Sequence, residues 1–317
     1  MRRTLCSMLL AIATSASLHA QNIKAELANL DDLNCRGRLS EVIQAANSLL
    51  ADTQLSLADQ GEVLIFLGSA YQQLGQFTPA TASYEKALAA FDREGSHPSS
   101  YAIALGSLAT VYSELGQLDT AKRVMLRSVR LFQNQSDHIG AALVFNDLAT
   151  MASEHHSLGE ARKYIKQALA ESQLVTIANP MMLAALTTTQ GRIAELDGDP
   201  HTAIACYQHS LDLWRQTHED QQQKAAWLYV LLGGAYLQSG DIAHARETTT
   251  HGLAMLEAAS GPQTPMYFLA QLAYSKVLDA SGARDEASTL RDQAQASLNT
   301  ATDHQRAQSH ISIAALR

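Results

Sequence analysis

A repeat of about 42 residues constrains the fold of this chain more than any other feature of its sequence. An alanine recurs at successive intervals of 41, 40, 42, 42 and 42 residues, at Ala80, Ala121, Ala161, Ala203, Ala245 and Ala287. Every copy except the third has a glycine five residues earlier, at Gly75, Gly116, Gly198, Gly240 and Gly282. The chain contains only 17 glycines, so this shared register indicates a stacked array of structural repeats.

Each repeat has the pattern of two helices joined at a glycine. In the clearest copy, residues spaced three or four apart form one face of each helix: Leu64, Leu67, Gly68 and Tyr71, then Ala80, Tyr84 and Ala87. Gly75 lies between the two groups, where the left-handed backbone that often ends a helix costs glycine least. One hairpin cannot bury both of its faces, so copies must stack. The pattern predicts an all-α solenoid of antiparallel helix pairs.

These residues resemble the tetratricopeptide repeat, whose signature places a large residue, Leu-Gly, Tyr, Gly, Ala, an aromatic residue and Ala at these offsets. The match is most specific between Gly61 and Phe91. The period near 42, together with the inter-repeat segment 95–98, resembles the kinesin-light-chain type of repeat. In the fifth and sixth copies, Thr249 and Arg291 replace the aromatic residue of the second helix, which leaves their registers open. The resemblance implies a right-handed superhelix of about six to seven repeats.

The chain divides into four predicted segments. Residues 1–20 have the order of a secretory signal peptide: Arg2 and Arg3, a short apolar run, and small residues ending at Ala20. The apolar run is too short to span a bilayer. The alternative interpretation of this segment is a buried N-terminal helix. Residues 21–60 form a degenerate helical hairpin, residues 61–298 the tandem repeats, and residues 299–317 a closing helix that Asp303 could cap. We therefore expect export to the periplasm or beyond the cell.

Composition argues against nucleic acid as a partner. The formal net charge is -8, or -8 - 2 = -10 once Arg2 and Arg3 are removed, and Lys and Arg are not clustered. Loss of the leader would leave Cys35 and Cys206, which lie too far apart in an array to form a disulfide and are expected to be buried thiols.

Motifs for catalysis or metal binding are weak. We find no glycine-rich phosphate loop, nucleophile elbow or HExxH pair. His244, Glu247 and His251 share one helix face and could meet a metal, but they lack a fourth ligand, so a solvated stripe is the preferred interpretation. The neighbours Glu154, His155 and His156 point in different directions on a helix. We therefore predict a protein without catalytic activity, metal or cofactor.

The resemblance also implies where a ligand would bind. In this family the first helices line a concave groove, and carrying over the groove positions selects Ser69, Gln72, Gln73, Thr110, Asn146, Thr150, Thr188, Arg192 and Trp227. Hydroxyl and amide groups predominate, which suits hydrogen bonding to an extended peptide backbone. The Lys and Asn clamp by which some members hold a C-terminal carboxylate is not reproduced. Asn146 and Arg192 are the strongest candidates, with ordinary solvated side chains as the alternative.

These expectations favour a scaffold or adaptor of the cell envelope that holds a peptide or a partner protein in the groove. The alternative is a structural component of an envelope or secretion assembly that uses the convex face or the ends of the array. The sequence does not identify the partner, because a fold shared by many proteins does not specify a function.

Overall fold

The computed structural model describes residues 21–34, 37–52, 55–216 and 222–300, and all regular secondary structure in these ranges is α-helix. The chain forms two compact units, Met1–Val111 and Tyr112–Arg317. The predicted signal peptide, Cys35 and Asp303 lie outside the described residues. The predicted all-α repeat array is confirmed in each unit.

The first unit contains a helix over residues 21–34, followed by α2 (Leu39–Leu50), α3 (Leu57–Gln73), α4 (Phe77–Glu94) and most of α5 (Ser99–Glu114). Leu30 and Val42 are fully buried, so the first two helices carry core residues, as expected for a helical hairpin. α3 begins at Leu57, four residues before the predicted boundary at residue 61, because the Ser56 hydroxyl caps it by accepting from the Asp59 backbone N–H at 3.1 Å.

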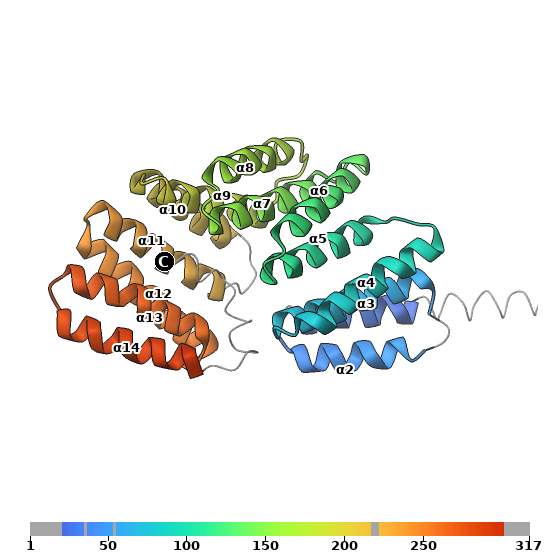
Figure 1. Ribbon diagram of the computed structural model, residues 1–317, viewed down its shortest axis with the longest axis horizontal. Helices are drawn as coiled ribbons and strands as arrows, with labels where there is room; N and C mark the ends of the chain where they lie inside the picture. The colour runs from blue at the N-terminus through green and yellow to red at the C-terminus, as the bar shows by residue number, and fades with distance from the viewer. Residues whose placement is uncertain (1–20, 35–36, 53–54, 217–221, 301–317) are drawn as a thin grey trace, which may run out of the picture. The chain divides into compact units, whose positions relative to one another are not determined.

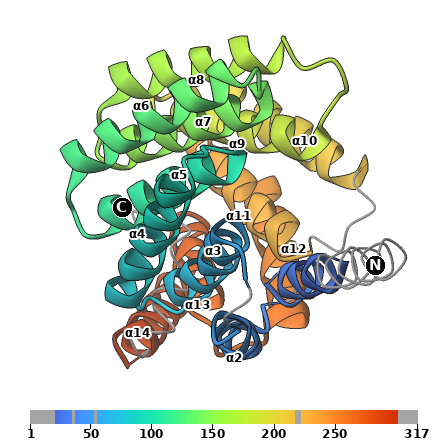
Figure 2. The ribbon, with the colours of Figure 1, turned by 90° about the vertical axis from the view of Figure 1, so that its right-hand side faces the viewer.

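The second unit contains the longer part of the array. Its helices are α6 (Leu118–Asn134), α7 (His138–Glu154), α8 (Leu158–Ser172), α9 (Pro180–Leu196), α10 (Pro200–Gln216), α11 (Gln222–Ser239), α12 (Ile242–Ser260), α13 (Pro265–Ala280) and α14 (Arg284–Thr300). From α7 onward they pack as antiparallel pairs, α7 with α8 through α13 with α14 (Figure 1). Neighbouring pairs also touch, and α6, α7 and α8 lie side by side (Figure 2). α14 extends through residues 299 and 300, whereas the sequence predicts that a separate closing helix begins at residue 299.

The glycines of the 42-residue register end the first helix of each repeat as predicted. Their φ angles are positive, from 69° at Gly75 to 88° at Gly282, which is the left-handed conformation that glycine adopts most readily. In the third copy the same conformation is taken by His156, with φ 56°. The third copy therefore forms the same left-handed turn with a histidine in place of the glycine.

Close packing of a glycine against a tyrosine joins the two helices of a repeat. A Cβ atom added to Gly68 would lie 2.7 Å from the ring of Tyr84, and one added to Gly191 would lie 2.7 Å from the ring of Tyr207. Both rings are buried, and each hydroxyl donates a hydrogen bond of 2.9 Å back to the first helix, to Gln72 and Glu195 respectively. The two repeats thus share one arrangement, with the bonded residues twelve positions apart.

The contacts of Thr249 and Arg291 settle the register of the last two copies. Thr249 is buried and takes the place of the tyrosine against Gly233, where its hydroxyl lies 2.0 Å from the position of an added Cβ. In the last copy, Arg291 forms an ion pair of 3.0 Å with Asp279, again twelve residues earlier. Both replacements therefore keep the predicted alignment.

No helix within the described ranges is long and apolar enough to cross a membrane. Cys206 is a free, half-buried thiol, and burial raises its pKa.

Candidate functional site

The groove residues predicted in the first unit are held by bonds within that unit. Ser69 and Gln73 both donate to the Asn34 side-chain oxygen, at 3.4 and 2.8 Å, and Gln72 accepts from Tyr84. The Thr110 hydroxyl donates to the Gly106 carbonyl at 3.2 Å. These side chains therefore support the repeats, and the structure does not bring them together into one cavity.

In the second unit, three of the predicted residues line one cavity. Thr150, Thr188 and Trp227 border a space of about 510 Å³ between α7, α9, α10 and α11. Sequence reasoning missed the remaining lining residues, which are Leu143, Asn179, Met181, Met182, Ala185, Thr189, Trp214 and Leu228. None of the lining residues carries a charge, and most are apolar, which is typical of a site that binds an organic group or side chain.

Two helices position most of this lining. On α7, Leu143 and Thr150 are seven residues apart and share one face. On α9, Asn179 caps the helix by accepting from the Met182 backbone N–H at 2.9 Å, and Pro180 occupies the first turn. This start places Met181, Ala185 and Thr188 on the face toward the cavity.

The depth of the cavity follows from the exposure of its walls. Met182 is 2% exposed and Trp227 is 5% exposed, so they form its base within the core. Leu143 is 38% exposed, so it lies at the rim. Leu143 could have been found from sequence, because it aligns with Trp227 and Ala185 in the repeat register. Trp214 could not, since it lies at the end of a second helix, outside the repeat signature.

The threonine hydroxyls of the site are bonded within the protein. Thr188 donates to the Ala184 carbonyl at 2.8 Å and lies 2.8 Å from the Ser210 hydroxyl. Thr150 and Thr189 approach each other at 3.4 Å. A helical threonine bonds readily to the carbonyl four residues earlier. The expectation that these hydroxyls serve an extended backbone is therefore not favoured, and the cavity offers mainly apolar surface.

Asn146 differs from these threonines. It lies on α7 between Leu143 and Thr150 and on the same helix face, but it is not among the residues that line the cavity, and the residue is only 8% exposed. Its side-chain oxygen is buried without a hydrogen-bond partner among the described residues. A buried polar group without a partner costs roughly 1–3 kcal/mol, so a hydrogen-bond donor that reached this oxygen would relieve that cost.

Arg192 is already paired. Its guanidinium donates to Glu195 at 2.9 Å, and Glu195 also accepts from the Tyr207 hydroxyl at 2.9 Å. The two charged side chains are 16% and 18% exposed. Arg192 therefore holds the fourth repeat together, and its predicted contact with an anion would compete with Glu195.

Acidic side chains lie on α7 and at the end of α5; on α7 they are on the face that carries Leu143 and Thr150, called here the inner face of α7. Asp147 lies one turn from Leu143, and desolvation by the surrounding protein raises the pKa of its carboxyl to about 7, although the side chain still has exposed surface. Desolvation, followed by repulsion from Glu154, raises the pKa of Glu114 to about 7 as well. Both carboxyls are therefore only partly ionised near pH 7, and they become fully negative at higher pH.

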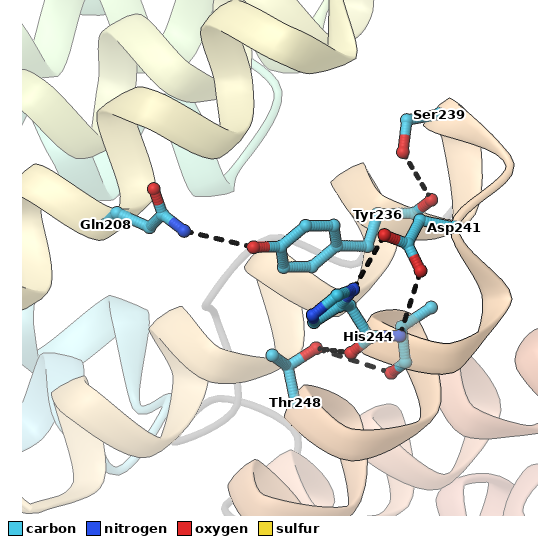
Figure 3. A network of polar contacts seen from close by, with 7 residues as sticks. Gln208, Tyr236, Ser239, Asp241, His244 and Thr248 are labelled. Atoms are coloured by element: carbon cyan, nitrogen blue, oxygen red, sulfur yellow. Dashed lines mark hydrogen bonds and ion pairs between the residues drawn. The ribbon is translucent and has the colours of Figure 1, made fainter.

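His244 and His251, the two histidines of the possible metal site, contact other side chains of the protein, and Figure 3 shows the contacts of His244. His244 contacts the Asp241 carboxylate at 2.7 Å and stacks on Tyr236 with ring centroids 5.1 Å apart, while Asp241 caps α12. His251 packs edge-on against Tyr229. Within the described ranges, no group of three or more His, Cys, Asp or Glu side chains is placed to hold a metal ion.

Comparisons with known proteins agree with the repeat architecture. A family model described as tetratricopeptide repeat matches residues 59–134, 100–170 and 182–258. Kinesin light chain-related protein 2 of Arabidopsis thaliana is 22% identical over 304 residues, which are 89% of this chain and 44% of that protein. The chain thus spans less than half the length of this relative.

Solved structures with low sequence identity share the fold. BtubC (BKLC) from P. vanneervenii matches with a TM-score of 0.55 and 18% identity, over 75% of this chain and 92% of that one. NprR in complex with its cognate peptide NprX matches with a TM-score of 0.63 and 15% identity, over 86% of this chain and 77% of that one.

Proposed function

Because this chain belongs to the tetratricopeptide repeat family, with repeats of the kinesin-light-chain type, we propose that it is a non-catalytic protein that binds a peptide segment of a partner. The single observation that carries the proposal is the apolar cavity of the second unit, to which three first helices and one second helix contribute. NprR, a structural neighbour solved with its cognate peptide, supports it by showing that this fold can hold such a ligand.

The arrangement of the cavity suits a side chain of a peptide better than a reacting substrate. Its lining has no charged group, and the carboxylate of Asp147 is one helical turn from Leu143 on α7. Catalysis would require a nucleophile or an acid–base pair within reach of a bound group, and the lining supplies only threonine hydroxyls that are bonded to the protein. Binding through burial of apolar surface needs no such group.

Selection from a random peptide library tests this function. Phage-displayed peptides of random sequence would be selected on the purified full-length chain, and the enriched peptides resynthesised with fluorescein for polarisation measurements. We expect saturable binding to the wild-type chain. Ala185→Trp, which fills the cavity with an indole, should weaken binding roughly tenfold or more.

The matched control is Ala243→Trp, which places the same side chain at an exposed position of α12 away from the cavity. It should bind the peptides as the wild type does. The proposal fails if no library peptide binds saturably, or if Ala185→Trp folds normally by circular dichroism and binds as tightly as the wild type.

We also propose that the chain acts in the cell envelope or outside the cell. The support is the order of positive charge, apolar run and small residues over positions 1–20. Mass spectrometry of the protein from an envelope fraction should find a mature chain that begins at Gln21. Recovery of the chain with Met1 still attached, and in the cytoplasmic fraction alone, would contradict export.

A further inference from the structure

We propose that the cavity of the second unit selects peptides in which a large apolar side chain is accompanied by a nearby Lys or Arg. This inference rests on the proposed function and adds the chemical class of the ligand. The apolar side chain would enter the cavity, and the cation would lie against Asp147 on the inner face of α7. Three independent features of the described residues support it.

The first feature is the size and chemistry of the cavity. A volume of about 510 Å³ lies within the range of sites that bind organic ligands, and Trp214, Trp227 and Met182 provide aromatic and polarisable walls. Leu143 at the rim is 38% exposed, so an inserted side chain would cover apolar surface that now faces solvent. The walls therefore favour Trp, Phe, Leu or Met over a small or polar residue.

The second feature is the unpartnered amide of Asn146. This side chain is more than nine-tenths buried, and its oxygen lacks a hydrogen-bond partner among the described residues. Asn146 lies beside the cavity and not in its lining, so a ligand reaches this oxygen only by displacing neighbouring side chains. An extended peptide that did so could donate a backbone N–H to it. A free apolar molecule of similar size would leave the oxygen unpaired. The feature therefore favours a peptide over a small apolar ligand.

The third feature is the charge around the cavity. Asp147 is four residues from Leu143 and three from Thr150, both of which line the cavity. No ion pair or hydrogen bond joins its carboxylate to another described side chain. Desolvation raises its pKa, so the group is only partly ionised near pH 7, and a cation held beside it would favour the ionised form. Glu154 repels the Glu114 carboxylate, so both contribute negative charge when they are ionised. Arg192, one turn beyond Thr188 on α9, forms an ion pair with Glu195 on the same helix. Lys276 on α13 interacts electrostatically with Glu195 and Arg192. Asp147 has no such interaction with a positive side chain among the described residues, so a ligand cation could lie beside it.

A set of four synthetic peptides separates the two requirements. Each is a nine-residue, fluorescein-labelled peptide of Gly and Ser with a central Trp or Ala and with Lys or Glu two residues to each side. Placing the charge on both sides makes the result independent of peptide direction. Polarisation with the full-length chain in low salt gives the four dissociation constants.

We expect the peptide with Trp and Lys to bind most tightly. Replacing Trp with Ala should weaken binding roughly tenfold or more, and replacing Lys with Glu should weaken it about threefold to tenfold. Higher salt should reduce the second effect and leave the first largely unchanged. The two effects report on the cavity and on the carboxylates separately.

Charge reversal locates the second effect. Asp147→Lys should invert the order of the Lys and Glu peptides, whereas Asp292→Lys, an exposed change on α14, should leave it unchanged. Circular dichroism verifies that both variants fold. If peptides from the random library bind but these four show no preference for Trp or for Lys, the inference is wrong and the proposed function stands. If no peptide of either set binds, the proposed function itself fails.

Discussion

Replacing Tyr207 with alanine should lower the free energy of unfolding by about 3–5 kcal/mol, the typical cost of removing a large buried aromatic side chain. The Tyr207 side chain is fully buried in the core of the second unit, and its ring packs directly on Gly191. Alanine would leave a cavity where α9 and α10 pack together. It would also remove the hydroxyl that donates to Glu195.

Urea unfolding followed by circular dichroism measures the loss, and hydrogen exchange over α9 and α10 shows whether it is centred on that hairpin, as expected for a repeat array. Tyr207→Phe is the control, because it keeps the ring and removes only the hydroxyl. Its expected cost is about 0.5–1.5 kcal/mol, since Glu195 stays paired with Arg192. Equal losses for the two variants would show that the ring does not carry the packing energy.

Replacing Gly191 with alanine should lower the free energy of unfolding by about 1–3 kcal/mol, even though alanine is the better helix former by roughly 1 kcal/mol. The added methyl carbon would lie 2.7 Å from the Tyr207 ring and 3.0 Å from the Cys206 Cβ. Gly159→Ala is the control, because this glycine lies in α8 with nothing within 4 Å of an added Cβ. It should be neutral or slightly stabilising.

A double substitution shows whether the clash is the cause. In the Tyr207→Ala background the ring is gone, so Gly191→Ala should cost much less than it does in the wild type. The same urea unfolding measurement on the four chains of this cycle gives the coupling. An unchanged cost in both backgrounds would rule out the ring as the source of the strain.

The architecture could be predicted because its determinants are local and repeated. The glycines that end the first helices and the alanines of the second helices recur at fixed spacing, and each copy supports the interpretation of the others. Thr249 and Arg291 were ambiguous only because the family signature expects an aromatic residue there. Their contacts with Gly233 and Asp279 could not be read from one copy, since they depend on which side chain faces which helix.

The candidate site could be predicted only in part. Thr150, Thr188 and Trp227 were found from the groove positions, but the positions do not reveal whether a hydroxyl is already bonded to its own helix. The groove positions select both Arg192 and Glu195 as residues that face a ligand. They do not indicate that the two side chains bond to each other. Met181, Met182 and Trp214 lie at helix ends, where the family signature specifies no residue.

In three of the repeats, residues twelve positions apart join the first helix to the second. The two helices of such a hairpin therefore depend on each other. Three chemistries fill the same role: an amide with a phenol at Gln72 and Tyr84, a carboxylate with a phenol at Glu195 and Tyr207, and a carboxylate with a guanidinium at Asp279 and Arg291. A first helix transplanted from one repeat to another would arrive without its complement. Duplication and shuffling of complete repeats would keep each pair of bonded residues together. Residues outside these pairs, including those that line the cavity, would remain free to diversify.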